Sequence, residues 1–253
     1  MTTEIEVRRL SSLADADEVV RVQIETWGEE QVVPREMVRA LCAAGDLVQG
    51  AFRRNRLVGS ALGFMAADDE GMHLHSHMLA VVPEEQGRGI GYTLKMAQRD
   101  AALEAGVTVM RWTFDPLIAR NAHLNLSKLG AWADGFTRDF YGQMNDSLNI
   151  GERSDRLWVR WDLDRPSGAV PDATDARVLL DIGGSGEPVP SPDRRDDATP
   201  AVVRIPGDYL ALRNKDPQMA SLWRDASAEA IEACLEDDLT AVAFLPGSSY
   251  LFA

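Results

Sequence analysis

The alternation of apolar and polar positions divides the chain into short strands and amphipathic helices. Ile5 and Val7 alternate with polar residues, which predicts a strand, and the apolar stripe between Leu13 and Trp27 predicts a helix capped by a serine. The same patterns predict helices at 34–45, 91–105 and 119–129, and strands at 46–53, 57–66, 72–82, 107–114 and 157–163. The helix between the strands at 72–82 and 107–114 implies a parallel pair joined by a right-handed crossover. The predicted class is α/β, or α+β with a mixed sheet.

The chain changes character after residue 165. Residues 166–200 are rich in Pro, Gly, Asp and Ser, which is typical of a linker, and one short strand is expected near 177–181. A strand at 202–205, a helix at 217–236 and a strand at 240–245 are predicted after it. We therefore expect a domain at 1–165, a linker at 166–200 and a strand-helix-strand extension at 201–253.

Composition narrows the classes of partner and the compartment. The formal net charge of −14 argues against a nucleic-acid partner, because phosphate binding needs a basic surface, and more weakly against a membrane partner. No apolar run is long enough to span a bilayer, and the N-terminus carries no signal peptide. Cys42 and Cys234 lie in apolar surroundings and are expected as buried free thiols. The expected location is the cytoplasm. The sequence does not decide the oligomeric state, and a homodimer is one possibility.

A glycine-rich segment, Gln86-Gly87-Arg88-Gly89-Ile90-Gly91, lies between a predicted strand and a predicted helix. Its spacing differs from the G-x-G-x-x-G dinucleotide fingerprint, and no Gly-Lys-Ser/Thr follows as in a P-loop. Backbone N–H groups at a helix N-terminus bind phosphate, and glycines let the ligand approach closely. A pyrophosphate is therefore a suitable ligand, and a tight turn without a ligand is the alternative.

The same segment matches the Gln/Arg-x-x-Gly-x-Gly/Ala signature and resembles the N-acetyltransferase (GNAT) superfamily. Leu79-Ala80-Val81-Val82-Pro83-Glu84 resembles the end of that family's fourth strand, and Ala122 with Lys128-Leu129-Gly130 resembles its second motif. The resemblance covers residues 4–163. It implies a mixed, mostly antiparallel twisted sheet flanked by helices, here followed by a C-terminal α/β extension. It also implies acetyl-CoA or another acyl-CoA, such as succinyl-CoA, as co-substrate.

The resemblance assigns the CoA-binding residues as well. In GNAT enzymes the pantetheine arm pairs with the fourth strand as an added strand would, and here the N–H of Leu79 is expected to face the thioester carbonyl. Asn121 is expected to bond the pantetheine, with an ordinary helix-surface asparagine as the alternative. The residues expected to bind the co-substrate are Leu79, Ala80, Val81, Gln86, Gly87, Arg88, Gly89, Ile90, Gly91, Tyr92 and Asn121.

Three histidines, His73, His75 and His77, alternate along the strand predicted at 72–82 and share one face. An acceptor amine must be neutral to attack a thioester, so a base assists the reaction. His75 falls near the position of a glutamate base in some GNAT enzymes, and His77 lies closer to the expected thioester. The alternatives are a solvated strand face or a hydrogen-bonded core histidine. No further ligand is evident, so no metal site is predicted.

One position departs from the family. Many GNAT enzymes carry a tyrosine two residues before the lysine of the second motif, where it protonates the leaving thiolate, and this chain carries Leu126 there. Tyr141, Ser127 or water could replace that acid, or the thiolate could leave unassisted. The departure also keeps open a catalytically silent CoA-binding regulatory module. Transfer of the acyl group to oxygen stays open as well.

The acceptor is expected at the polar segment between residues 141 and 156. Asn145, Asp155 and Arg156 are the candidate substrate-binding residues. Arg156 could clamp a carboxylate and Asp155 could hold an ammonium group, whereas a surface pair at a strand start is the alternative for both. The predicted function is transfer of an acyl group from CoA to a small amine or amino acid.

Overall fold

The computed structural model describes residues 4–45, 48–142, 152–166, 168–191 and 199–253, and these fall into two compact units. The first unit holds residues 4–112 and 162–165. The second unit holds residues 113–142, 152–161 and those from 166 onward. The division between the units falls within a strand. The domain boundaries expected at 165 and 200 stay predictions.

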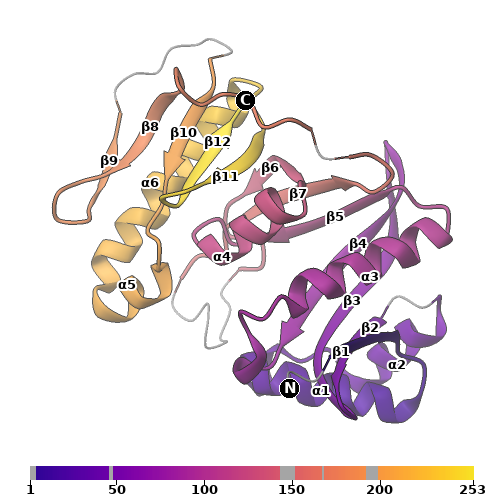
Figure 1. Ribbon diagram of the computed structural model, residues 1–253. Helices are drawn as coiled ribbons and strands as arrows, with labels where there is room; N and C mark the ends of the chain where they lie inside the picture. Colours follow the sequence, from indigo (N-terminus) through magenta and orange to yellow (C-terminus); the bar gives the residue numbers. More distant parts are fainter. Residues whose placement is uncertain (1–3, 46–47, 143–151, 167, 192–198) are drawn as a thin grey trace. The chain divides into compact units, whose positions relative to one another are not determined.

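The first unit contains a largely antiparallel sheet with the strand order β1-β2-β3-β4-β5 (Figure 1). Its strands are β1 (Ile5–Arg9), β2 (Val48–Arg53), β3 (Arg56–Asp68), β4 (Gly71–Val81) and β5 (Val109–Phe114), whose last two residues belong to the second unit. Strands β4 and β5 pair in parallel, as the crossover helix between them requires. The parallel pair expected from the sequence is therefore present.

Three helices pack on this sheet: α1 (Leu13–Trp27), α2 (Arg35–Ala43) and α3 (Ile90–Glu104). Figure 1 shows α3 running across β3 and β4. Their apolar sides, together with β2, β3 and β4, enclose a core in which Val19, Val38, Leu57 and Leu94 are fully buried. Burial of these side chains is the main force that holds the helices on the sheet.

A capping box fixes the start of α1. The Ser12 Oγ accepts a hydrogen bond from the Asp15 N–H at 3.0 Å, and the Asp15 carboxylate accepts one from the Ser12 N–H at 3.0 Å. These two bonds satisfy donors that a helix start leaves without partners. The serine cap expected from the sequence is thus present, and Ser12 is the residue that forms it.

The second unit contains a sheet with the strand order β7-β6-β11-β12-β10-β8-β9. Its strands are β6 (Trp132–Thr137), β7 (Arg156–Asp162), β8 (Arg177–Ile182), β9 (Pro188–Pro190), β10 (Ala201–Arg204), β11 (Ala241–Leu245) and β12 (Ser249–Phe252). The pairs described within it are antiparallel apart from β8 and β10. Ala133 of β6 pairs with Ala241 of β11, so strands from distant parts of the chain share one sheet.

The helices of the second unit are α4 (Ala119–Ala122), α5 (Tyr209–Lys215) and α6 (Pro217–Glu236). Helix α4 continues directly into a π-helix, His123–Lys128. Helix α6 starts at Pro217, behind Asp216, whose carboxylate accepts the Met219 N–H at 3.0 Å. Proline suits this first position because its missing N–H has no helical partner there.

The overall class is confirmed, and three local predictions are corrected. Residues 123–128 form a π-helix, where an α-helix was expected. The segment predicted as a linker carries two strands, β8 and β9, where one was expected, and both pair within the second sheet. Helix α5 and strand β12 were missed. The reason is common to β9, α5 and β12: each has seven residues or fewer, so a periodic pattern has little length in which to show.

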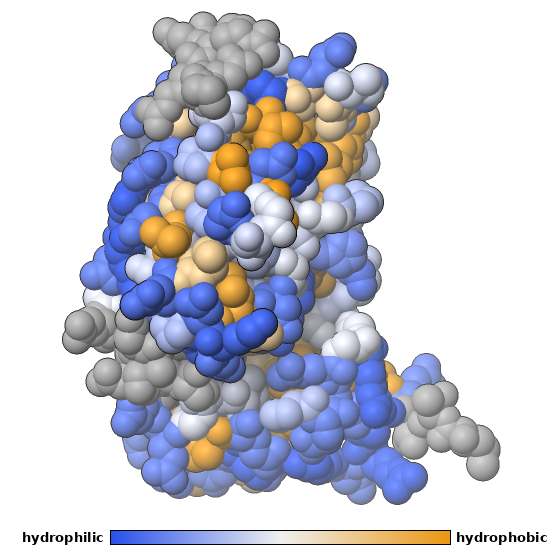
Figure 2. Space-filling view, turned by 90° about the vertical axis from the view of Figure 1, so that its left-hand side faces the viewer, coloured by the Kyte–Doolittle hydropathy of each residue, from blue (hydrophilic) through white to orange (hydrophobic). Residues whose placement is uncertain are grey.

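Hydrophilic side chains cover most of the face shown in Figure 2, in keeping with the formal net charge of −14. None of the helices described is both long and apolar enough to cross a bilayer. Cys42 and Cys234 are free and buried, as expected. Within the described part of the chain, no three His, Cys, Asp or Glu side chains gather as metal ligands would.

Replacing Ser12 with Ala should lower the free energy of unfolding by about 1 kcal/mol, because the variant leaves the Asp15 N–H without its cap. Urea unfolding of wild type and variant measures the difference. Ser11→Ala is the matched control, since Ser11 donates only its backbone N–H to Asp15. The free energy of unfolding of this control should stay within about 0.5 kcal/mol of the wild-type value. Equal losses in both variants would contradict the capping role.

Candidate active site

A β-bulge distorts β4 at His77. Along the β3–β4 ladder Leu62 pairs with Met78 and Gly63 pairs with Ser76, so His77 is an extra residue with no partner on β3. Bulges bend a strand and redirect side chains, and they are common next to active sites. The bulge therefore marks this part of β4 as a candidate site.

The imidazoles of His75 and His77 gather with the ring of Phe64 on one face of the sheet. The His75 ring stacks on Phe64 with 4.9 Å between centroids, and 6.2 Å separates it from the His77 ring. His75 is half-buried, whereas His77 is exposed. His73 is buried apart from them, with its Nδ1 3.5 Å from the Asp68 carboxylate. The structure thus brings together two of the three histidines singled out in the sequence.

Both histidines of this pair are held in the neutral form. Burial, with the nearby charges of His77, His73 and Lys95, lowers the pKa of His75 to about 4. The pKa of His77 is lowered too, because the surrounding protein partly desolvates its ring even though the side chain reaches the surface. A neutral imidazole is the form that accepts a proton, but a base titrating far below neutrality accepts one weakly. His77 is therefore the better base of the two, and its exposure lets a substrate reach it.

The edge of β4 that faces away from β3 is mostly unpaired. Strand β4 pairs with β5 only at Leu74 and His75, while it pairs with β3 along its whole length. The Val82 N–H donates to Val58 of β3, and since backbone groups alternate, Ala80 also turns toward β3. Leu79 and Val81 consequently turn their N–H and C=O groups to the free edge. Ala80, expected with them, offers no backbone group there.

The side chain of Gln86 closes part of this free edge. Its Nε2 donates to the Val81 carbonyl at 2.9 Å, so the glutamine acts within the chain and fixes the end of β4. This leaves the Leu79 N–H and C=O and the Val81 N–H available on the edge. An extended ligand such as a pantetheine arm can pair with such groups in the manner of an added strand.

The glycine turn follows Gln86 and leads into α3. Gly87 has φ 76° and Gly89 has φ 82°, a conformation that side-chain-bearing residues rarely adopt, and Gly89 is the N-cap of α3. No side chain caps this helix. The first N–H groups of a helix have no partner within it, so the start of α3, including Gly91 and Tyr92, presents donors to an anion.

An ion pair supports the turn from behind. The Arg53 guanidinium binds the Glu85 carboxylate through Nε at 2.7 Å and Nη2 at 2.9 Å. Arg88, inside the turn, lies 3.5 Å from the same carboxylate and is largely exposed. A bidentate pair of this kind fixes orientation as well as distance. The turn is therefore anchored to β2, and the Arg88 side chain remains at the surface.

Comparison with known families identifies this arrangement. Residues 16–130 match the family model described as the acetyltransferase (GNAT) family. Residues 16–130 form a GNAT acetyltransferase domain. The resemblance read from the glycine turn is thereby confirmed for residues 16–130, and this part of the chain has the fold of an acyltransferase family.

Solved GNAT structures share the fold. The ribosomal-protein-S18-alanine N-acetyltransferase from Escherichia coli superposes with a TM-score of 0.53 at 14% identity, over 67% of this chain and 100% of that one. A putative acetyltransferase from Salmonella typhimurium, solved with its cofactor acetyl-CoA, superposes with a TM-score of 0.52 at 20% identity, over 67% and 98%. At these identities the likeness concerns the fold alone. A comparison with curated proteins found no match.

The second GNAT motif lies in the second unit, on α4 and the π-helix. Leu126 is buried, and the neighbouring Ser127 Oγ donates to the Phe244 carbonyl at 2.7 Å. Asn121 is half-buried, and its side chain makes no hydrogen bond to the residues that the structure describes. A π-helical turn often marks a functional site. Ser127 is thus engaged in the fold, while the Asn121 amide is available to a ligand.

The residues expected at the acceptor are tied to one another in the second unit. Asp155 is 1% exposed, and its carboxylate accepts bonds from Arg153 at 2.7 and 3.0 Å and from the Asp139 N–H at 3.0 Å. Arg156 is buried, with its guanidinium 5.1 Å above the ring of the exposed Tyr141. These bonds favour structural roles for Asp155 and Arg156, and their acceptor role stays a prediction. Asn145 lies outside the described residues.

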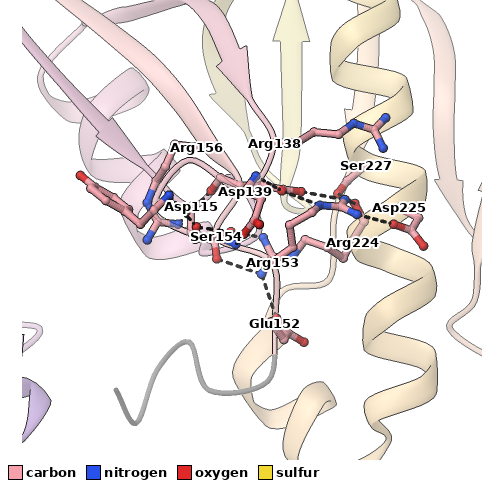
Figure 3. A network of polar contacts seen from close by, with 12 residues as sticks. Asp115, Arg138, Asp139, Glu152, Arg153, Ser154, Arg156, Arg224, Asp225 and Ser227 are labelled. Carbon is pink, nitrogen blue, oxygen red and sulfur yellow. Dashed lines mark hydrogen bonds and ion pairs between the residues drawn. The ribbon is translucent and has the colours of Figure 1, made fainter. Parts of the chain in front are cut away.

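A buried arginine, which the sequence did not reveal, centres the neighbouring network (Figure 3). Arg224 of α6 binds both carboxylate oxygens of Asp115, at 2.7 and 2.9 Å, and also Glu152 at 3.0 Å. Burial opposes the charge, but Asp115, Tyr209 and Glu152 together outweigh it and raise the pKa of Arg224. Tyr250 of β12 donates to the Pro116 carbonyl at 2.6 Å. The C-terminal elements thus hold the segment that leads into α4.

Replacing His75 with Gln should flatten the fall in stability as pH drops from about 6.5 to about 4. Over that range the unfolded chain gains a proton at this histidine before the folded chain does, so the free energy of unfolding of the wild type falls with pH. The variant should lose at most ~1.4 kcal/mol per pH unit of this slope, the value for one proton. Urea unfolding at several pH values measures it.

His123→Gln is the control for this experiment, since His123 is an exposed histidine that does not belong to the three histidines on β4. The control should keep the wild-type slope. If the free energy of unfolding of His75→Gln changed with pH as steeply as that of the wild type, the lowered pKa could not be assigned to His75.

Proposed function

We propose that this protein transfers a short acyl group from acyl-CoA to a small amine or amino acid, with the glycine turn holding the pyrophosphate. The observation that carries the proposal is the unpaired edge of β4, where Leu79 and Val81 offer backbone groups. The glycine turn then leads from β4 to the start of α3, where no side chain caps the free N–H groups. The solved Salmonella typhimurium relative with acetyl-CoA supports acyl-CoA as the co-substrate. The free thiols of Cys42 and Cys234 suit a reducing compartment, so we place the protein in the cytoplasm.

In the proposed reaction the acceptor nitrogen attacks the thioester carbon and a C–N bond forms. The Leu79 N–H stabilises the oxyanion as charge develops on the carbonyl oxygen. His77 accepts the proton that the nitrogen gives up. The C–S bond then breaks, and the CoA thiolate takes a proton from water. Leu126 cannot supply this proton, so a thiol of ordinary pKa must leave without the tyrosine that many GNAT enzymes use.

Gly89→Ala should weaken acyl-CoA binding by roughly tenfold or more, because a side chain strains the φ of 82° and shifts the amides at the start of α3. Isothermal titration with acetyl-CoA, and its effect on the melting temperature, measures binding. Gly106→Ala is the matched control, since Gly106 has φ 76° after the other end of α3 and open space around its Cβ position. Equal affinities in both variants would count against the turn as the pyrophosphate site.

Thiol release from several acyl-CoA donors, measured over a panel of amines, amino acids and short peptides, tests the function itself. We expect turnover with a small amine or amino acid, and His77→Ala should lower kcat by about 10²–10⁴ while acyl-CoA affinity stays close to that of the wild type. His123→Ala serves as the control. Tight acyl-CoA binding without turnover on any acceptor would favour a regulatory CoA-binding module, and turnover only on peptides would replace the proposed acceptor.

A further inference from the structure

Helix α3 carries a buried lysine that has no acidic partner. Lys95 is 4% exposed, and its Nζ donates to the Ser76 Oγ at 2.8 Å. Its other neighbours are the Met110 sulfur at 4.0 Å and the Trp112 ring, whose centroid is 3.7 Å away. Lys95 makes no ion pair with the residues described in the structure. Lysine is almost never fully buried unless it is paired, so this position requires an explanation.

The amine lies where β4 and β5 part. The last pairs between these strands are Leu74 with Met110 and His75 with Arg111. Ser76 and Trp112 are the next residues along each strand, and the Lys95 amine contacts both of them. Past this point the edge of β4 is unpaired and the bulge at His77 begins. Lys95 therefore lies at the point where β4 and β5 separate, which we call the vertex. The unpaired edge of β4 proposed to bind the pantetheine arm begins there.

A polar chain links the amine to the strand and back to the helix. Ser76 Oγ accepts from Lys95 and donates to the Gln98 Oε1 at 2.7 Å. Gln98 is 1% exposed, and its Nε2 has no hydrogen-bond partner in the described structure. Burial lowers the pKa of Lys95 well below its ordinary value. Three buried polar side chains, one incompletely bonded, thus occupy a position that an apolar cluster would fill more stably.

We propose that Lys95 is a positioning residue for acyl transfer, which sets the vertex between β4 and β5 through Ser76 and Trp112. This inference rests on the proposed function. The amine holds Ser76, and Ser76 directly precedes the bulged His77, so the geometry of the base and of the Leu79 N–H depends on this contact. Burying the amine lowers the stability of the fold. The buried lysine is kept despite this cost because it serves function, since costly buried polar groups concentrate at functional sites.

Lys95→Met tests the proposal, because methionine fills a similar volume without a polar atom. We expect kcat to fall by roughly 10²-fold, as displacements near 1 Å of a reacting group do. The KM for acyl-CoA should stay within about twofold, and the melting temperature should equal or exceed that of the wild type. Leu94→Met, at a buried position next to Lys95, is the control and should keep kcat within about twofold.

Ser76→Ala provides the second arm. It should lower kcat as well, and the double variant should lose no more than Lys95→Met alone, because the two residues act through one contact. Three results overturn the proposal: a Lys95→Met kcat equal to wild type, a joint loss of melting temperature, acyl-CoA binding and kcat, or an acyl group on Lys95 in the mass spectrum. Thiol release by the wild type in the same assay separates failure of the Lys95 proposal from failure of the proposed function. If the wild type releases no thiol, the result counts against acyl transfer itself.

Discussion

The parting of β4 from β5 is the constraint on which the rest of the first unit depends. Two residue pairs join these strands, and beyond them β4 continues to Val81 with one edge unpaired. Backbone groups left without partners cost free energy unless water or a ligand satisfies them. The fold therefore leaves an edge of β4 with which an extended ligand can pair. The glycine turn that follows β4 places the unpaired N–H groups of a helix start directly after that edge.

Several local interactions maintain this arrangement. Gln86 bonds the Val81 carbonyl and so ends the free edge at a defined residue. Glu85, held by both nitrogens of the Arg53 fork, anchors the turn to β2. Lys95 and Ser76 occupy the vertex. Each contact is polar and at least partly buried, which makes it specific in geometry although weak as a source of stability.

The second unit gives the C-terminal part of the chain a structural explanation. Its strands extend the sheet that contains β6 and β7, and α6 supplies Arg224 to Asp115 at the start of the segment leading to α4. Removing one member of such a buried pair leaves the other charge without compensation, so the segment and α6 depend on each other. The C-terminal residues are consequently part of the fold that carries the second GNAT motif. An independent appendage would not share these bonds.

The sequence by itself determined the features that depend on neighbouring residues. The glycine-rich turn between a strand and a helix, the serine cap of α1 and the crossover helix that makes β4 and β5 parallel all follow from local spacing. Only the tertiary structure decided the bulge at His77, the burial of Lys95 and the pairing of Asp115 with Arg224, which are 109 residues apart. The physical reason is that a local pattern records which face of an element is apolar. The strand register, and the polar group that must meet another across the core, are set by long-range packing.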